Sequence, residues 1–154
     1  MKTKAEIQIE SPRAAGVPEL IAALDDYLSS LYPPTSNHFL DLDQLSQPDI
    51  RLFVARRDGA PLACGALRIA RDYGEVKRMY VSPAARGEGL GRAILARIES
   101  EASRAGLRVM RLETGNLQAE ALALYRSAGY VDCEPFGEYR PDPLSLFLEK
   151  QLGA

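Results

Sequence analysis

A glycine-rich stretch near the middle of the chain decides the fold, and its sequence is Val81-Ser82-Pro83-Ala84-Ala85-Arg86-Gly87-Glu88-Gly89-Leu90-Gly91-Arg92. The residues before it, Glu75–Val81, are typical of a strand, and those from Gly89 to Ala105 repeat apolar side chains at helical spacing. A strand that enters a helix through such a turn leaves the first helical amides without internal partners, and the helix dipole adds partial positive charge there. The stretch therefore predicts a site for a phosphate or pyrophosphate group.

The spacing of the glycines restricts which phosphate ligand this turn can hold. A dinucleotide fingerprint requires G-x-G-x-x-G, but Arg92 stands where its third glycine belongs. A Walker A loop ends in Gly-Lys-Ser or Gly-Lys-Thr, and that tripeptide is absent here. Both nucleotide readings fail, and the pattern that remains is Arg-x-x-Gly-x-Gly, from Arg86 to Gly91.

Around this stretch the sequence predicts a succession of strands and helices. Strands are expected at residues 5–10, 50–57, 62–70, 109–114, 130–133 and 145–150, and helices at residues 17–31 and 118–128. A short helix is expected at Phe39–Leu45, and Asp58-Gly59 is a hairpin signal. This order predicts an α/β or α+β layer with a mixed sheet.

Composition excludes several classes of protein. The 154 residues, of which 46% are hydrophobic and 26% charged, are expected to form a single globular domain, 1–154, and not a disordered chain. The net charge of −2 shows no basic excess, so a nucleic-acid partner is not expected, and the doublets Arg56-Arg57 and Lys77-Arg78 are interpreted as solvated charges.

No membrane association is expected, because the sequence has no apolar run of transmembrane length and no signal-peptide core. Cys64 and Cys133 form no CxxC pair, which favours the reducing cytoplasm. One histidine and two scattered cysteines do not make a zinc site, so no metal is expected.

Two motifs together resemble the GNAT superfamily of N-acetyltransferases. The first is the Arg-x-x-Gly-x-Gly loop, and the second is the block Ala121-Leu122-Ala123-Leu124-Tyr125-Arg126-Ser127-Ala128-Gly129-Tyr130, which is similar to the family's A-x-x-L-Y-x-x-x-G-F/Y. The resemblance implies a mixed, mostly antiparallel sheet of six to seven strands flanked by about four helices. It also implies direct transfer of an acetyl group from acetyl-CoA to a primary amine in a ternary complex.

The resemblance also implies where acetyl-CoA, as acyl-donor co-substrate, would bind. Its pantetheine arm would pair with the backbone of Met79, Tyr80 and Val81. Its pyrophosphate would be held by the amides of Arg86, Gly87, Glu88, Gly89, Leu90, Gly91 and Arg92. The Val81 amide would point at the thioester carbonyl oxygen, where negative charge develops during attack.

Within the second motif, Tyr125 matches the family tyrosine that protonates the departing thiolate; the alternative is an ordinary aromatic anchor on the helix. Gln118 stands where many family members have asparagine, which is a departure, and Asn116 in the same loop is close enough to take that role. Both residues are equally consistent with simple turn chemistry at the helix entry.

The attacking amine must lose a proton, because an amine with a pKa of about 10.4 is neutral only about once in 2,500 molecules at pH 7. Glu75 has an offset from Val81 similar to that of the catalytic glutamate in the family's histone-acetylating branch. Strand alternation predicts that Glu75, Lys77, Met79 and Val81 share one face, while a Glu75–Lys77 surface pair is the alternative. Glu113 on the next strand is the competing carboxylate.

By the same resemblance, Tyr32, His38 and Phe39 would line the acceptor pocket, with Tyr139 on its other wall. The acceptor itself, a small-molecule amine or a protein amine, is left open, as is a homodimer of the kind common in the family. A second function fits the same loop, namely a non-catalytic module that senses or binds acyl-CoA. The two functions differ in whether an amine accelerates release of the thiol.

Overall fold

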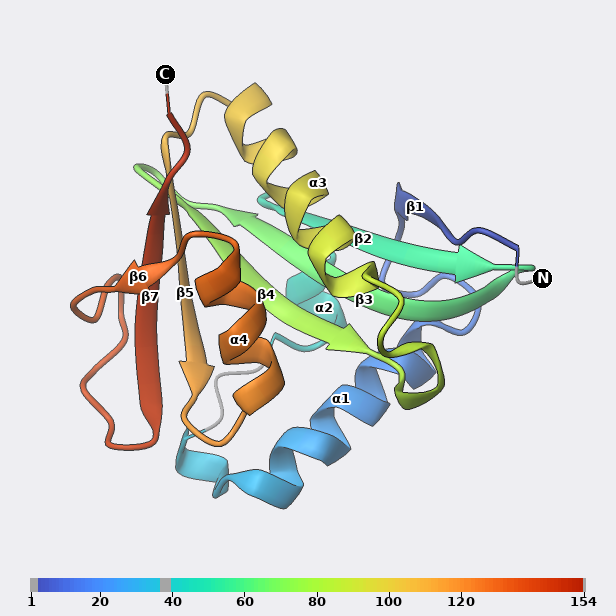
Figure 1. Cartoon of the computed structure of the whole chain (residues 1–154), viewed down its shortest axis with the longest axis horizontal. Helices are drawn as coiled ribbons and strands as arrows, with labels where there is room; N and C mark the ends of the chain where they lie inside the picture. The colour runs from blue at the N-terminus through green and yellow to red at the C-terminus, as the bar shows by residue number, and fades with distance from the viewer. Residues whose placement is uncertain (1–2, 37–39, 154) are drawn as a thin grey trace.

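The computed structural model describes residues 3–36 and 40–153, and its centre is a seven-stranded sheet in the order β1-β2-β3-β4-β5-β7-β6 (Figure 1). The strands are β1 (Glu6–Ile9), β2 (Ile50–Arg57), β3 (Ala60–Ile69), β4 (Gly74–Val81), β5 (Val109–Gly115), β6 (Val131–Asp132) and β7 (Ser145–Gln151). Only the β4–β5 pair is parallel among these strands; the other neighbours are antiparallel. The expected mixed, mostly antiparallel sheet is confirmed.

Four α-helices in the described part of the chain cover the two faces of the sheet, as expected. They are α1 (Val17–Leu31), α2 (Leu42–Leu45), α3 (Leu90–Arg104) and α4 (Ala119–Ser127). One apolar cluster joins α3 and α4 to the sheet through side chains such as Ile94 and Tyr125, and the other joins α1 and α2 through Ile21 and Leu45. Burial of both clusters supplies the main free energy of folding.

β4 and β5 separate soon after they begin, which opens the sheet at its centre (Figure 1). They pair only at Gly74↔Met110 and Glu75↔Arg111. Beyond Glu75, β4 stays paired with β3 alone as far as Val81. The divergence leaves the β5-facing backbone of β4 without a neighbouring strand, so this edge can take hydrogen bonds from a ligand.

The side-chain alternation expected along β4 is wrong beyond Lys77, because the strand contains a bulge. Arg78 has a φ of +58°, and the register with β3 shifts between Cys64 and Ala66. An extra residue in one strand reverses the inward and outward pattern that follows it. Glu75 and Lys77 therefore share the α1/α2 face, whereas Met79 packs into the α3 cluster on the opposite face.

Element boundaries agree with the sequence to within a few residues, and α2 is the clearest difference. This helix is shorter than the expected Phe39–Leu45, because Asp41 caps it: its Oδ1 accepts the N–H of Gln44 at 2.8 Å, and the Gln44 side chain accepts the N–H of Asp41 at 2.9 Å. Phe39 itself lies outside the described residues. Over residues 3–36 and 40–153, none of the helices has the length and apolar character needed to span a membrane.

Candidate active site

The glycine-rich turn takes the conformation that an anion site requires. After a short 3-10 turn at Pro83–Ala85, Gly87 and Gly89 adopt φ values of +83° and +79°, which glycine reaches at little cost. Gly89 caps α3, and the first intrahelical bond of this end runs from the Ala93 N–H to the Gly89 oxygen at 3.0 Å. The amides of Leu90, Gly91 and Arg92 precede that bond, so all three are available to an anion.

A groove of about 310 Å³ runs from this turn along β4 to α4. Most of the residues predicted to bind the cofactor line it: Met79, Tyr80, Val81, Arg86, Gly87, Gly89, Leu90, Gly91, Arg92, Gln118 and Tyr125. Glu88 instead forms an ion pair with Arg57 of β2. The groove thus joins the helix end, the open edge of β4 and α4 in one cavity.

The orientation of the Val81 amide follows from the ladder between β3 and β4. Ser82 donates its N–H to the Leu62 oxygen at 2.8 Å. Because N–H groups alternate in direction along an antiparallel strand, the N–H of Val81 points away from β3, toward the opening between β4 and β5. It therefore faces the groove.

A smaller, polar pocket of about 80 Å³ adjoins the groove between the diverging strands. Leu24, Met79, Gln118 and Tyr125 line both cavities, so they form the wall that the two share. Three residues expected to bind the acceptor, Tyr32, Glu113 and Tyr139, line the smaller pocket. The other two, His38 and Phe39, lie outside the described residues.

Tyr125 is buried at the junction, with 5% of its surface exposed. Its ring packs edge-on against Tyr130 at a centroid distance of 5.9 Å. Burial raises the pKa of the Tyr125 phenol, and the negative charge of Glu113 raises it further. The phenol is therefore neutral at physiological pH and holds a proton that it can donate.

The two candidate amides of the β5–α4 loop lie in different places. Gln118 precedes α4 and lines both cavities, and the N–H of its neighbour Leu117 donates to the Tyr32 hydroxyl at 2.8 Å. Asn116 is exposed and lines neither cavity. Of the two, Gln118 has the position from which an amide can reach a bound ligand.

The two candidate carboxylates also differ in access. Glu113 lines the smaller pocket and accepts a hydrogen bond from the Ser145 hydroxyl at 2.7 Å. Glu75 is only 1% exposed and accepts a hydrogen bond from the Tyr139 hydroxyl at 2.5 Å. Glu75 does not line the smaller pocket; with Tyr139 and Lys77 it lines a third cavity of about 550 Å³.

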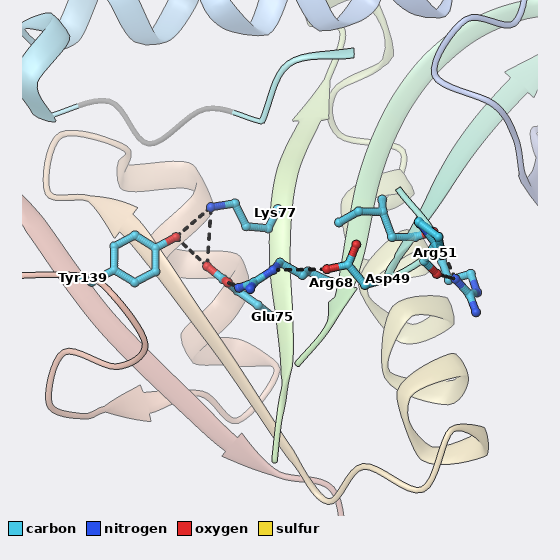
Figure 2. A network of polar contacts seen from close by, with 8 residues as sticks. Asp49, Arg51, Arg68, Glu75, Lys77 and Tyr139 are labelled. Atoms are coloured by element: carbon cyan, nitrogen blue, oxygen red, sulfur yellow. Dashed lines mark hydrogen bonds and ion pairs between the residues drawn. The ribbon is translucent and has the colours of Figure 1, made fainter. Parts of the chain in front are cut away.

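Figure 2 shows that Glu75 is the centre of a polar network, with Tyr139 and Lys77 on one side and Arg68 on the other. Lys77 Nζ lies 3.5 Å from Glu75 Oε2 and donates to the Tyr139 hydroxyl at 2.7 Å. On the other side, Arg68 Nη1 lies 3.2 Å from Glu75 Oε1, and Arg68 Nε lies 3.6 Å from Asp49. Burial and the Glu75 charge raise the pKa of Tyr139, so its phenol keeps its proton and fixes the pocket wall.

Comparison with known proteins places the chain in a family. The sequence model of the acetyltransferase (GNAT) family matches residues 18–130. The chain belongs to the GNAT acetyltransferase family. It is 57% identical over 145 residues to a protein named IAA acetyltransferase from Azospirillum brasilense, a match that covers 93% of this chain and 95% of that protein.

Other GNAT proteins agree with this assignment. An uncharacterised N-acetyltransferase of Bacillus subtilis, YsnE, is 34% identical over 87% of this chain and 93% of its own length. A Klebsiella pneumoniae crystal structure, provisionally described as an acyl-CoA N-acyltransferase, superposes with a TM-score of 0.85 at 37% identity, covering 97% of this chain and 98% of that one. PaiA N-acetyltransferase from Thermoplasma acidophilum, solved with coenzyme A, shares the fold at 15% identity, with a TM-score of 0.75 and coverage of 97% and 99%.

The candidate site also contains residues that the sequence analysis missed. Arg78, expected as a solvated charge, is buried, and Lys77 is partly buried; 3% and 11% of their side chains are exposed, and both line the smaller pocket. Arg78 pairs with Asp25 of α1 and donates to the Ile21 oxygen at 3.4 Å. The bulge turns this second cation toward α1, and no sequence pattern announces a positive φ at an arginine.

Helix α1 contributes Leu24 and Tyr27 to the groove, and these residues were also missed. Their apolar periodicity was visible, but it did not show that part of this stripe lines a cavity. Among the described residues, no group of three or more His, Cys, Asp or Glu side chains is arranged to hold a metal ion.

Proposed function

We propose that this protein binds acetyl-CoA in the groove and transfers its acetyl group to a primary amine held in the adjoining pocket, by direct attack in a ternary complex. The observation that carries the proposal is the wall shared by the two cavities, where Tyr125 and Gln118 stand between a phosphate-binding turn and a polar pocket. Membership of the GNAT family supports the reaction class.

The groove fits the proposed donor. The amides of Arg86 through Arg92 would hold the pyrophosphate, since an added Cβ at Gly87 or Gly89 would meet nothing within 4 Å and the backbone is open to a ligand. The positive end of the α3 dipole favours an anion there. The backbone of Met79, Tyr80 and Val81 would pair with the amide-containing arm, as an added strand would.

Val81 and Tyr125 would act on the two atoms whose charge changes. The Val81 N–H would donate to the thioester oxygen, and one such preorganised donor is worth about 3 kcal/mol of barrier. Tyr125 would give its proton to the departing sulfur as the bond between carbon and sulfur breaks. Its raised pKa keeps the phenol protonated until that step.

A carboxylate or a path to water must take the amine proton. Glu113 has the more direct access, because it lines the pocket beside Tyr125. Glu75, the other proposed base, lines a different cavity and already accepts from Tyr139 and Arg68. We therefore place Glu113 next to the amine and assign Glu75 to holding Tyr139 and Lys77 in position.

The acceptor is proposed only as a class, a small-molecule or protein amine. The Azospirillum brasilense relative carries the name IAA acetyltransferase, so IAA belongs in the acceptor panel beside primary amines, amino acids and peptides. We further propose a cytoplasmic protein that uses neither nucleic acid nor membrane, in keeping with its net charge of −2. A homodimer is a further proposal, which sedimentation would test.

Calorimetry with acetyl-CoA, CoA and NAD tests the cofactor half of the proposal, and we expect binding of the first two only. Gly91→Asp should weaken acetyl-CoA binding at least about tenfold more than Gly91→Asn, because the variants match in size and differ in a charge placed beside the pyrophosphate. Equal affinities of the two variants would contradict pyrophosphate binding at this turn.

Release of free thiol in the presence of the acceptor panel tests the catalytic half. An enzyme releases thiol faster when its amine is present. If acetyl-CoA binds but no amine accelerates thiol release, the non-catalytic acyl-CoA sensor replaces the enzyme as the better account.

A further inference from the structure

Charges of opposite sign line the smaller pocket on the two strands that diverge around it. Among the described residues, its charged lining consists of Lys77 and Arg78 from β4 and Glu113 from β5. The two strands pair only as far as Glu75↔Arg111, so all three side chains lie beyond the last paired residues, where the sheet is open. The pocket therefore has a cationic side from β4 and an anionic side from β5.

Both cations are held by carboxylates that do not line the pocket. The Arg78 side chain is 3% exposed, and its Nη2 pairs with Asp25 of α1. Lys77 Nζ lies 3.5 Å from Glu75 Oε2 and donates to the hydroxyl of Tyr139, a residue of the pocket wall, at 2.7 Å (Figure 2). Neither Asp25 nor Glu75 lines the smaller pocket. A ligand in the pocket therefore meets the two cations and not the carboxylates that pair with them.

The anionic side of the pocket is Glu113, which the proposed function places next to the acceptor amine. Its Oε2 accepts a hydrogen bond from the Ser145 hydroxyl at 2.7 Å. A hydroxyl orients a carboxylate without supplying a compensating charge. An ammonium group is attracted to this side of the pocket, whereas Lys77 and Arg78 attract an anion.

We propose that the acceptor is an α-amino acid, whose ammonium group lies beside Glu113 and whose carboxylate lies beside Arg78 and Lys77. The inference rests on the proposed function and narrows its acceptor class. A guanidinium carries several N–H donors in a planar fork that matches a carboxylate, so Arg78 can serve Asp25 and a ligand together. The two charged groups of an α-amino acid are attached to one carbon, which suits a pocket of only about 80 Å³.

The product would be an N-acetylamino acid. The ammonium group gives one proton to Glu113, and its nitrogen then bonds the acetyl carbon while the bond from that carbon to sulfur breaks. Tyr125 protonates the departing sulfur, and the second proton released by the nitrogen replaces the one that Tyr125 gave. The amino acid side chain would extend toward the third cavity, of about 550 Å³, since Lys77 and Tyr139 line both cavities.

The same charges disfavour other amines. An amine without a carboxylate would displace water from Arg78 and Lys77 and offer them no anion in return, and desolvation of an uncompensated cation is costly. A polyamine would bring a second positive charge against these two residues and be repelled. The pocket therefore distinguishes an amino acid from an amine of similar size by charge.

Acceptors that differ only in the carboxylate test the inference. The common L-amino acids are each compared with their α-amides, and kcat/KM is measured by thiol release at pH 7. We expect the best amino acid to exceed its amide at least about tenfold, the worth of one charge-assisted hydrogen bond. The carboxylate makes the neighbouring amine more basic, so basicity favours the amide and cannot produce this preference. An amide, a simple amine or a polyamine that is used as well as the best amino acid would overturn the inference.

Variants of the two cations test where the carboxylate binds. Arg78→Met should reduce the ratio of acid to amide to about one, and Arg78→Lys, which keeps the charge, should retain part of it. A general loss of structure lowers both rates alike and leaves this ratio unchanged. Lys77→Met is the second variant, and it should also lower the ratio. A wild-type ratio in every variant of Arg78 and Lys77 that folds would overturn the inference.

Arg56→Met is the matched control for the loss of a paired arginine. Arg56 Nη2 lies 2.9 Å from Glu10 Oε1, but Arg56 lines none of the three cavities. The ratio of acid to amide in Arg56→Met should therefore equal that of wild type. If the control lowers the ratio as much as Arg78→Met, the effect is not local to the pocket and the inference fails.

Binding measurements keep the inference apart from the proposed function. If wild type transfers acetyl to no amine, the catalytic proposal fails, and calorimetry of each amino acid and its amide against the CoA-saturated protein decides the inference by itself. Tighter binding of the acid, lost in Arg78→Met, would support it; equal binding of the pair, or none, would overturn it. If wild type acetylates amines regardless of a carboxylate, only the inference fails.

Discussion

Gly65 of β3 lies directly against Met79 of β4, because a Cβ on Gly65 would come within 2.3 Å of the Met79 sulfur. The same Cβ would be 2.7 Å from Ile94 of α3. This contact exists because the bulge at Arg78 returns Met79 to the α3 face. Met79 in turn lines both cavities, so a glycine in the core supports the wall between the proposed donor and acceptor sites.

Gly65→Ala should lower the free energy of unfolding by about 1–3 kcal/mol, because the added methyl group overpacks the core against Met79 and Ile94. Urea denaturation at constant pH measures the loss. Adding Met79→Ala should recover part of it by vacating the space beside the new methyl group. A Gly65→Ala variant as stable as wild type would contradict the close packing described here.

Tyr125→Phe should lower kcat at least about tenfold while the acetyl-CoA dissociation constant changes little, because the variant loses the proposed acid and keeps the ring. Tyr130→Phe is the matched control, since it removes a neighbouring hydroxyl that donates to Glu99 and lies outside both cavities. Steady-state thiol release and calorimetry supply the two numbers. A Tyr125→Phe enzyme with wild-type turnover would exclude this residue as the acid.

The pH profile of the wild type gives a second test of Tyr125. Burial raises the pKa of this phenol above the ordinary value of about 10, so the proton stays on the oxygen as the pH rises through that value. We therefore expect kcat to show no loss between pH 8 and about pH 10. A fall in kcat below pH 10 that is absent in Tyr125→Phe would mean that the phenol ionises early.

Glu113→Gln should lower the rate of catalysis, whereas Glu75→Gln should lower the stability of the fold. If Glu113 takes the amine proton, Glu113→Gln should lower kcat near pH 7, and the deficit should shrink as the pH approaches the amine pKa of about 10.4. Glu75→Gln should chiefly lower the free energy of unfolding, by about 3 kcal/mol, since it removes the buried carboxylate that pairs with Arg68 and Lys77. If the pH-dependent loss of kcat appears in Glu75→Gln and not in Glu113→Gln, Glu75 is the base.

Ionisation of the buried Cys64 thiol should lower the free energy of unfolding at alkaline pH. Burial raises the pKa of its thiol from an ordinary value near 9 to about 12, and its Sγ donates to the Arg78 oxygen at 3.3 Å. Because the folded pKa is the higher one, the protonated thiol stabilises the fold fully below pH 9, and this contribution disappears as the pH rises toward 12. Above pH 9 the stability of wild type relative to Cys64→Ala should fall by about 1.4 kcal/mol per pH unit. Denaturant titrations of both proteins measure the difference, and a constant difference would mean that the thiol is not buried.

The family, the sheet and the conformation of the glycine-rich turn were predictable from the sequence because local rules govern them. Glycines that need a positive φ, a helix that follows a strand, and a tyrosine in the second motif all act within a few residues of chain. Gly87, Gly89 and Tyr125 accordingly line the groove that the sequence predicted for them. The error along β4 has the same origin, because the rule of side-chain alternation assumes a regular strand and a bulge breaks it.

The sequence by itself determined the nature of the proposed donor site, since backbone amides at a helix end bind an anion whatever the distant chain does. Only the tertiary structure decided what stands opposite it. The bulge at Arg78 turned that side chain toward Asp25 of α1. Tyr139 hydrogen-bonded Glu75 across the sheet opening, and Tyr32 joined α1 to the loop before α4. These relationships join residues far apart in the chain, and their geometry is set by packing and desolvation, which no short sequence pattern encodes.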